Sequence, residues 1–360
     1  MTTGAPAPLV LQAARVIPPR PRRDPFGRAA GVYDAEGAFC HAANVQRSGR
    51  LEIRPAALPG QPGMRVPGRH LYGGQLNHHF GHFLCESLAR LWALDHLERP
   101  VESILLLPRR PGSGVELQGF HKAVLGQLDL PVPVRVVDQP MIVDELVVPE
   151  QGFGNGGLCA GSPAFRSYIH RHFAPDVQPD GPENLYISRE GLSLLAGSIL
   201  GEEALSRNLT RAGYEAFSPE AHDIRTQIAR YKAAKRIIAV EGSALHLYGF
   251  VGHAAQQVAI ITRRSDHTTS NAIADQLRHF CGSEPLVLDT IRREWDIVSG
   301  PVRSSKSVSL LDMPALGARL AAAGMVPPAP WIEAKVDIER RIGRISARTG
   351  RMLAECPRAG

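Results

Sequence analysis

The sequence has few cysteines and no long apolar run. Its 360 residues include five cysteines, an odd number without a C-x-x-C pair, which argues against a disulfide framework and a thiolate metal site. No stretch approaches membrane-spanning length, and the first residues lack the basic start and cleavage-like site of a secretion signal. We therefore expect a cytoplasmic protein, with peripheral contact at the inner membrane left open.

Nucleic-acid-binding signatures are missing as well. The chain contains no RNP, zinc-finger or helix-turn-helix pattern, and its net charge of +6 arises from well-mixed acidic and basic residues. This charge favours small anionic partners such as phosphates over nucleic acid. A chain of this length suits two domains better than one core.

Apolar segments alternate along most of the chain in the order typical of α/β proteins. Residues 1–75, rich in Pro, Gly and Arg, predict a β-rich lead-in packed on a first lobe at 76–178. After the linker-like "APDVQPDGPEN", a second lobe spans 179–300 and a helical tail 301–360. The pattern predicts two tandem Rossmann-like, doubly wound lobes with a ligand site between them, at the carboxyl ends of the strands.

The second lobe and the tail allow more detailed predictions. Strands are expected at "LYIS", "YEAFS", "RIIAVEG", "QQVAIIT" and "PLVLD", with helices at 202–212, from Ser218 through Lys235, at "SALHLYGF" and at 268–280. From Trp331 we expect an amphipathic basic helix with apolar Ile332, Val336, Ile342 and Ile345. This helix either packs on the body or a sister subunit, or lies on a membrane.

Histidines crowd the start of the segment "NHHFGHFLCESLARLW", residues 77–92. On a helix His78, His82 and Glu86 would share one face. Two histidines one turn apart can share zinc, although the glutamate of H-E-x-x-H is replaced by His79. A carboxylate one turn from an imidazole can also orient a general base. The third interpretation is a helix start with solvated or core-satisfied histidines.

Two glycine-containing turns follow predicted strands. "QGFGNGG", residues 151–157, matches G-x-G-x-x-G but opens no helix, since the next one is expected at Ser162 and Pro163; we interpret it as a cleft loop. In "AVEGSALHLYGF" a strand enters a helix through Gly242 and Ser243, either a phosphate site or an ordinary turn. Arg189 in "LYISRE" is either a diphosphate ligand or a solvated surface group.

In order, "NHHFGHFLCESLARLW", "LYISRE" and "TQIARYKAAKRIIAVEGSALHLYGF" resemble the glycosyltransferase 61 family (DUF563 type) of bacterial polysaccharide enzymes, over roughly residues 70–265. The resemblance implies a GT-B architecture and inverting transfer from a nucleotide sugar, usually without a bound metal. Consistently, the sequence has no D-x-D pair to hold a divalent cation against a diphosphate. The chain departs from the family pattern at Glu241, where a histidine is usual, and at Ser198 and Gly201, where an Arg and an Asn are usual.

The predicted function is an inverting, metal-independent glycosyltransferase of cell-surface polysaccharide biosynthesis, with no cofactor besides the nucleotide-sugar co-substrate. Its base is His82, or Glu86 with His82 as partner, and lobe one holds a glycan acceptor near Asn77, His78, Gly154 and Asn155. Lobe two binds the donor through Ser188, Arg189, Glu241, Gly242, Ser243, Ala244, Leu245 and His246. Glu241 is expected to accept hydrogen bonds from ribose hydroxyls. A non-catalytic nucleotide- or carbohydrate-binding protein and, third, a zinc hydrolase using His78 and His82 are the competing classes, and a homodimer is left open.

Overall fold

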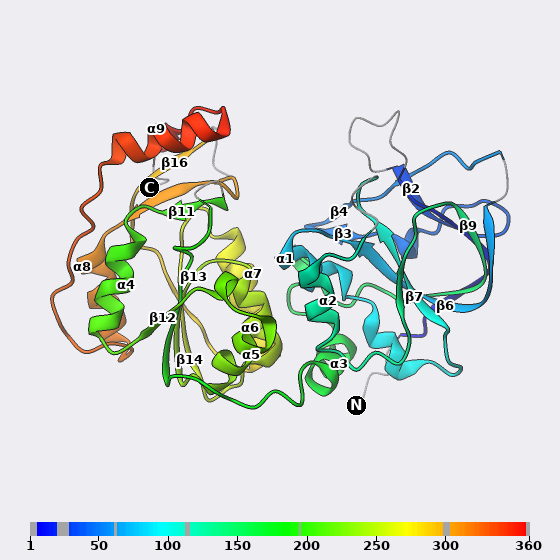
Figure 1. Cartoon of the computed structure of the whole chain (residues 1–360), viewed down its shortest axis with the longest axis horizontal. Coiled ribbons are helices and arrows are strands. Elements are labelled where there is room, and N and C mark those ends of the chain that lie inside the picture. Colours follow the sequence, from blue (N-terminus) through cyan, green and yellow to red (C-terminus); the bar gives the residue numbers. More distant parts are fainter. Residues whose placement is uncertain are drawn as a thin grey trace. The chain divides into compact units, whose positions relative to one another are not determined.

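The computed structural model describes residues 6–19, 29–60, 63–111, 116–193, 196–297 and 303–357. The chain divides into two compact units, unit 1 (Met1–Pro175) and unit 2 (Asp176–Gly360), each with its own sheets and helices (Figure 1). The division falls inside the linker-like "APDVQPDGPEN" segment. The α/β class predicted from the sequence is therefore confirmed. Within the described ranges, no helix is both long enough and apolar enough to cross a bilayer.

Unit 1 is built on a seven-stranded mixed sheet in the order β5-β2-β1-β9-β6-β7-β8. The strands are β1 (Leu9–Ile17), β2 (Ala29–Tyr33), β5 (Arg54–Pro55), β6 (Met64–Leu76), β7 (Ser103–Pro108), β8 (Val134–Val136) and β9 (Met141–Val148). Strands β9, β6, β7 and β8 run parallel, whereas β1 pairs antiparallel with β9 and β2. Every residue of β7 is buried, as expected for a central parallel strand.

Short helices and one hairpin complete unit 1. The α-helices are α1 (Phe80–His82), α2 (Gly119–Leu125) and α3 (Pro163–His172), with single turns at His41–Ala43 and Gly156–Leu158. Helix α3 begins at the predicted place, where the Ser162 side chain accepts a hydrogen bond from the Phe165 amide. Strands β3 (Gln46–Arg47) and β4 (Arg50–Leu51) form the hairpin.

The segment at 77–92 is not one regular helix, and this expectation is wrong. After α1 the chain makes a π-helical turn at Phe83–Ser87 and a 3-10 segment at Leu91–His96. Every residue from 83 to 93 is buried, so tertiary packing on all sides outweighs the preference for a single amphipathic helix. His78 precedes α1 and does not share a helix face with His82.

Unit 2 contains a five-stranded parallel sheet in the order β12-β10-β13-β14-β15. Its strands are β10 (Asn184–Ile187), β12 (Glu215–Phe217), β13 (Arg236–Val240), β14 (Gln257–Ile261) and β15 (Leu286–Leu288). Figure 1 shows α4 (Glu202–Arg211) and α8 (Met313–Ala322) on one face, and α5 (Ile224–Ala233), α6 (Ala244–Val251) and α7 (Thr268–Cys281) on the other. The doubly wound second lobe and its five strands match the prediction.

Three details of unit 2 differ from the expectations. Ser218 and Pro219 begin only a short turn, Pro219–Ala221, because Asp223 caps α5 by accepting a hydrogen bond from the Thr226 amide. A second sheet, β11-β17-β16-β18, was not predicted; it contains β11 (Ser198–Ile199), β16 (Ile291–Asp296), β17 (Val308–Leu311) and β18 (Ala354–Glu355). The tail helix α9 (Ile338–Thr349) begins after Asp337, not near Trp331. Ile345 of α9 is buried in an apolar cluster with Trp295 and Leu353, so α9 packs on the body of its own unit.

Candidate active site

Polar side chains gather where the parallel strands of unit 1 end. Asn77 follows β6, Arg109 follows β7, and Asn155 lies in the loop after β9. Because β9, β6 and β7 are parallel neighbours, their carboxyl ends share one edge of the sheet. Glu86, on the π-helical turn after β6, joins this group.

Glu86 is the centre of the network. Its carboxylate is only 1% exposed and accepts hydrogen bonds from Arg47 Nε (2.6 Å) and Asn155 Nδ2 (2.8 Å) on Oε1. Arg47 Nη2 also pairs with Oε2, so the guanidinium binds both carboxylate oxygens.

Arg47 reaches Glu86 from the β3–β4 hairpin. The two turn residues, Ser48 and Gly49, both have positive φ (47° and 77°), as in a type I′ turn. The Ser48 amide donates to the Asn155 carbonyl oxygen (3.2 Å), which ties the hairpin to the loop after β9. The hairpin turn therefore places the Arg47 guanidinium against the carboxylate of Glu86, 39 residues later in the chain.

The Glu86 carboxyl group is ionised at neutral pH. Burial by itself would raise its pKa, but hydrogen bonds from Arg47 and His82 and the charge of Arg47 lower the pKa to about 2. Burial likewise disfavours the charged Arg47, yet its bond to Glu86 leaves the pKa of the guanidinium raised. Both partners are therefore held in their charged forms.

His82 has the geometry of an oriented base. Its Nδ1 lies 3.2 Å from Glu86 Oε1, and its side chain is 31% exposed. In the neutral tautomer that donates from Nδ1 to the ionised carboxylate, the lone pair is on Nε2. The Asn155 amide nitrogen also lies 3.2 Å from Nδ1. Within the described ranges no side chain or backbone group bonds to Nε2. An accessible imidazole with this tautomer can take a proton from a hydroxyl group.

A second ring of charges surrounds this pair. Glu52 Oε2 accepts from Arg47 Nη1 (3.1 Å) and Arg109 Nη2 (3.2 Å), and Arg109 Nη1 donates to Asn77 Oδ1 (3.3 Å). Two guanidinium groups thus alternate with two carboxylates, which fixes Arg47 from the side opposite Glu86.

The other acceptor-side candidates lie in different surroundings. The His78 ring stands edge-to-face with His121, 5.0 Å away, and its Nε2 is buried with no hydrogen-bond partner among the residues that the structure describes. His121 is itself fixed by the Gln118 amide and the Asn77 carbonyl. A Cβ at Gly154 would lie 2.6 Å from Gln151 Nε2, so a side chain there would displace the Gln151 amide from its bonds to the Gln46 and Phe153 carbonyls. Gly154 therefore shapes the loop that presents Asn155.

In unit 2 the donor candidates also meet at the carboxyl edge of the sheet. Ser188 and Arg189 follow β10, and Glu241 and Gly242 follow the neighbouring β13. A Cβ on Gly242 would lie 2.5 Å from Arg189 Nη1, so the guanidinium lies directly over this glycine at the start of α6. The Ser188 hydroxyl and the Arg189 amide both donate to Glu202 Oε1 (3.2 and 2.6 Å).

Glu241 is fully buried and paired. Arg264 donates to Glu241 Oε1 through Nε (2.9 Å) and Nη2 (2.6 Å), whereas Oε2 is buried and has no partner in the part of the chain that the structure describes. Ser243 and Ala244 begin α6, but Leu245 is wholly buried and His246 Nδ1 bonds to Gln276 on α7 (2.6 Å). Of the predicted α6 residues, Ser243 and Ala244 are best placed to offer groups at the sheet edge.

Six charged residues of these clusters were missed in the sequence: Arg47, Glu52, Arg109, Glu202, Arg263 and Arg264. Arg47 lies in a short hairpin that no motif marks, and Arg263 and Arg264 directly follow β14 and Thr262. The signal for the arginine pair is present in "AIITRRSD", where two cations stand at the carboxyl end of a predicted strand. No local signal identifies Arg47.

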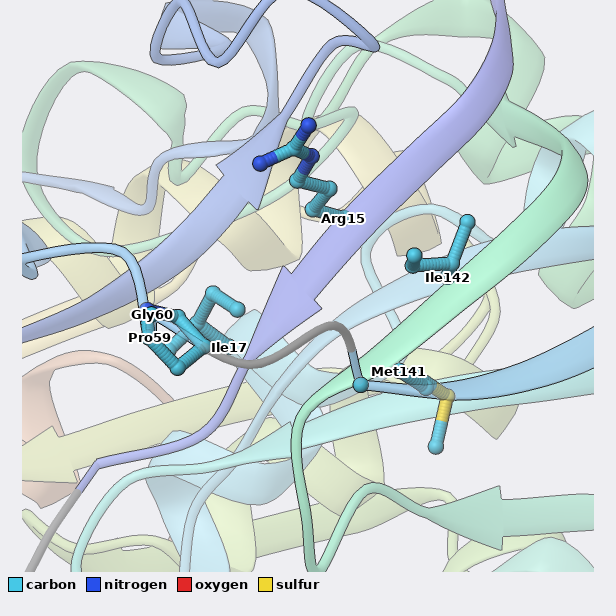
Figure 2. A pocket seen from close by; sticks show the side chains of 7 residues that line it. Arg15, Ile17, Pro59, Gly60, Met141 and Ile142 are labelled. Atoms are coloured by element: carbon cyan, nitrogen blue, oxygen red, sulfur yellow. The ribbon is translucent and has the colours of Figure 1, made fainter.

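Figure 2 shows a pocket elsewhere in unit 1. Its volume is about 220 Å³, and it is lined by Arg15, Ile17, Pro59, Gly60, Gly63, Met141 and Ile142. Met141 begins β9, so this pocket lies at the opposite end of that strand from Asn155. Its lining includes no histidine or acid.

Metal-ligand geometry is absent from the part of the chain that the structure describes. There, no three His, Cys, Asp or Glu side chains converge in a way that could hold a metal ion. His78 and His82, considered as a zinc pair, face His121 and Glu86 respectively.

Comparison with known proteins identifies the family. A sequence model described as Glycosyltransferase 61 matches residues 80–260, half of the chain. That segment includes His82, Glu86, Arg189 and Glu241 but neither Arg47 nor the arginine pair after β14. No curated protein matches the chain. The chain belongs to the glycosyltransferase 61 family, whose members transfer sugars.

Proposed function

We propose that this protein is an inverting glycosyltransferase that moves a sugar from a nucleotide-sugar donor to a glycan or related acceptor in cell-surface polysaccharide biosynthesis. One observation carries the proposal: His82 donates to an ionised, buried Glu86 that Arg47 holds on both oxygens. A free imidazole lone pair beside a fixed carboxylate is the arrangement that general base catalysis requires.

The acceptor hydroxyl is the group that His82 would deprotonate. Its proton moves to Nε2 while its oxygen attacks the anomeric carbon of the donor sugar from the face opposite the nucleotide. The bond from that carbon to the diphosphate oxygen breaks, and the electron pair leaves with the nucleotide, which inverts the anomeric centre. A Glu86 carboxyl with a pKa of about 2 is a weak base, so we assign it to orienting His82 and stabilising the imidazolium.

We assign the donor to the carboxyl edge of the unit 2 sheet. Arg189 lies over Gly242, and the amide groups of Ser243 and Ala244 begin α6. Cations and a helix amino terminus stabilise the negative charge that builds up on a departing diphosphate. This supports a leaving group held by the protein's own groups, without a metal.

The test separates binding from chemistry. His82→Ala and Glu86→Gln are assayed with a panel of nucleotide sugars and acceptors, with exposed His170 of α3 replaced by Ala as the control. We expect a rate loss of about 10²- to 10⁴-fold in His82→Ala, with the donor-induced rise in melting temperature unchanged. Near-normal turnover in His82→Ala refutes the base assignment. Donor binding without turnover in the wild type favours a non-catalytic binding protein instead.

The cellular site is a further part of the proposal. All five cysteines are free thiols, which suits a reducing cytoplasm. We propose that the protein acts there, with peripheral association at the inner membrane as the point to test by fractionating cells and washing the membranes with salt.

A further inference from the structure

Two arginines of unit 2 lie outside the family-matched segment. Arg263 and Arg264 follow β14, which is the parallel neighbour of β13, so they reach the edge that carries Glu241 and Gly242. Each is only 6% exposed. A buried guanidinium group is costly unless its charge and its donors are satisfied.

The charges of this cluster do not balance. Glu241 is the only described carboxylate that pairs with the guanidinium of Arg189, Arg263 or Arg264. Its Oε1 is hydrogen-bonded to Arg264 and lies 3.9 Å from Arg263 Nε. Arg263 donates to the carbonyls of Glu241 (3.3 Å) and Ser305 (3.1 Å). Arg189 donates to the carbonyls of Ala196 and Gly197 (3.2 Å each).

Other acids near the cluster are occupied elsewhere. Glu202 Oε1 accepts hydrogen bonds from the Arg189 amide and the Tyr186 hydroxyl, and burial raises the pKa of its carboxyl group. Asp266 accepts from the amides of Thr268 and Arg303. Burial, and next the charge of Arg189, lower the pKa of Arg263 to about 10 despite Glu241. Three cations therefore share one direct counter-ion.

Unused donors converge on the start of α6. Arg189 Nε is buried and has no hydrogen-bond partner among the described residues, and Nη1 of the same residue lies over Gly242. Among the described residues, Arg263 Nη2 and Arg264 Nη1 make no hydrogen bond. The Ser243 and Ala244 amides also have no partner within those residues. Unpaired donors and excess positive charge are what an anion with several oxygens satisfies.

We propose that Arg263 and Arg264 complete, with Arg189 and the first amides of α6, a subsite for the two phosphate groups of a diphosphate ligand. The identity of that ligand as the nucleotide sugar rests on the function proposed above. In the absence of ligand, Glu241 is the counter-ion of Arg264, which it binds through Oε1. The diphosphate bridges cations that the protein alone leaves unpaired.

Calorimetry with inorganic pyrophosphate, orthophosphate and nucleoside diphosphates tests the subsite directly. Wild type is compared with Arg263→Gln, Arg264→Gln and the control Arg211→Gln, which changes an exposed arginine at the end of α4. Each subsite variant should weaken pyrophosphate binding about 10- to 100-fold, the effect of losing a hydrogen bond to a charged group, and the control should not. Pyrophosphate should bind more tightly than orthophosphate. Equal binding by wild type and both variants, or no binding by folded wild type, overturns the proposal.

The variant Glu241→Gln distinguishes loss of a subsite residue from damage to the fold, because its expected effect on pyrophosphate binding has the opposite sign. Removing the negative charge leaves the arginines without a direct counter-ion, so pyrophosphate should bind severalfold more tightly, which a damaged site cannot do. Weaker pyrophosphate binding overturns the role of Glu241 as a counter-ion. His82→Ala separates this proposal from the catalytic one, because it should retain pyrophosphate binding whether or not transfer is lost.

Discussion

Replacing Arg47 by Met should destabilise the protein strongly, because it leaves the buried carboxylate of Glu86 without its positively charged partner. The pKa of Glu86 is lowered from 4.5 to about 2, so its favourable contacts outweigh the cost of burial by about 3 kcal/mol. Arg47 supplies the first of those contacts and His82 the next. Breaking a buried ion pair on one side costs about 3–5 kcal/mol in other proteins, which agrees with this value.

Urea unfolding at pH 7 measures the effect. Wild type, Arg47→Met, Glu86→Gln and the double variant form a cycle, in which the double variant should be less destabilised than the two single losses added together, by about 1–3 kcal/mol. Arg50→Met is the matched control, since Arg50 is an exposed residue of the same hairpin. The reasoning fails if Arg47→Met unfolds at the same urea concentration as Arg50→Met, or if the two single losses simply add.

Three further outcomes are expected. Because the pKa of Glu86 is lowered on folding, its stabilising effect is complete above pH 4.5 and is lost as the pH falls towards 2; the difference in unfolding free energy between wild type and Glu86→Gln should shrink over that interval, and a constant difference contradicts the pairing. Gly197→Ala should reduce pyrophosphate affinity in calorimetry, because φ is +74° and its Cβ would collide with Arg263 Nη1 and with the Ser305 and Ser307 carbonyl oxygens around it. Gly213→Ala (φ +90°, no neighbour within 4 Å) should leave that affinity unchanged and lower the unfolding free energy by only about 1–2 kcal/mol of backbone strain; an unchanged pyrophosphate affinity in Gly197→Ala would contradict a role of Arg263 in the subsite. Ile345→Ala should lower the unfolding free energy by about 2–4 kcal/mol, since Ile345 is 1% exposed, while Ile332→Ala, at a residue 52% exposed, should change it by less than about 0.5 kcal/mol; similar melting curves for the two would contradict the packing of α9.

Much of unit 2 could be predicted from the sequence because its signals are local. Buried parallel strands appear as short apolar runs such as "RIIAV", and the helices between them follow turn and cap residues. His82 and Glu86 are four residues apart, a spacing that predicts contact between side chains on a helix. In the structure His82 Nδ1 lies 3.2 Å from Glu86 Oε1. Ser162 as the cap of α3 belongs to this class too.

Local patterns failed where burial on every side replaced periodicity. The segment after His79 has an apolar pattern that suits a helix, but it is enclosed by unit 1 and forms short turns of different types. The helix of the tail also starts later than its apolar spacing suggested, because Asp337 provides the cap. Helix boundaries depend on such competing contacts.

The sequence by itself determined the α/β class, the alternation of unit 2, and the pairing of an imidazole with a carboxylate one turn away. Only the tertiary structure decided which charges complete each cluster. Arg47 and Asn155 are 39 and 69 residues from Glu86, and the arginine pair meets Glu241 because β14 lies beside β13. The order of strands in a sheet is set by the packing of the whole unit. When a charged residue comes from a neighbouring strand that is distant in the sequence, no periodic pattern in the sequence marks it.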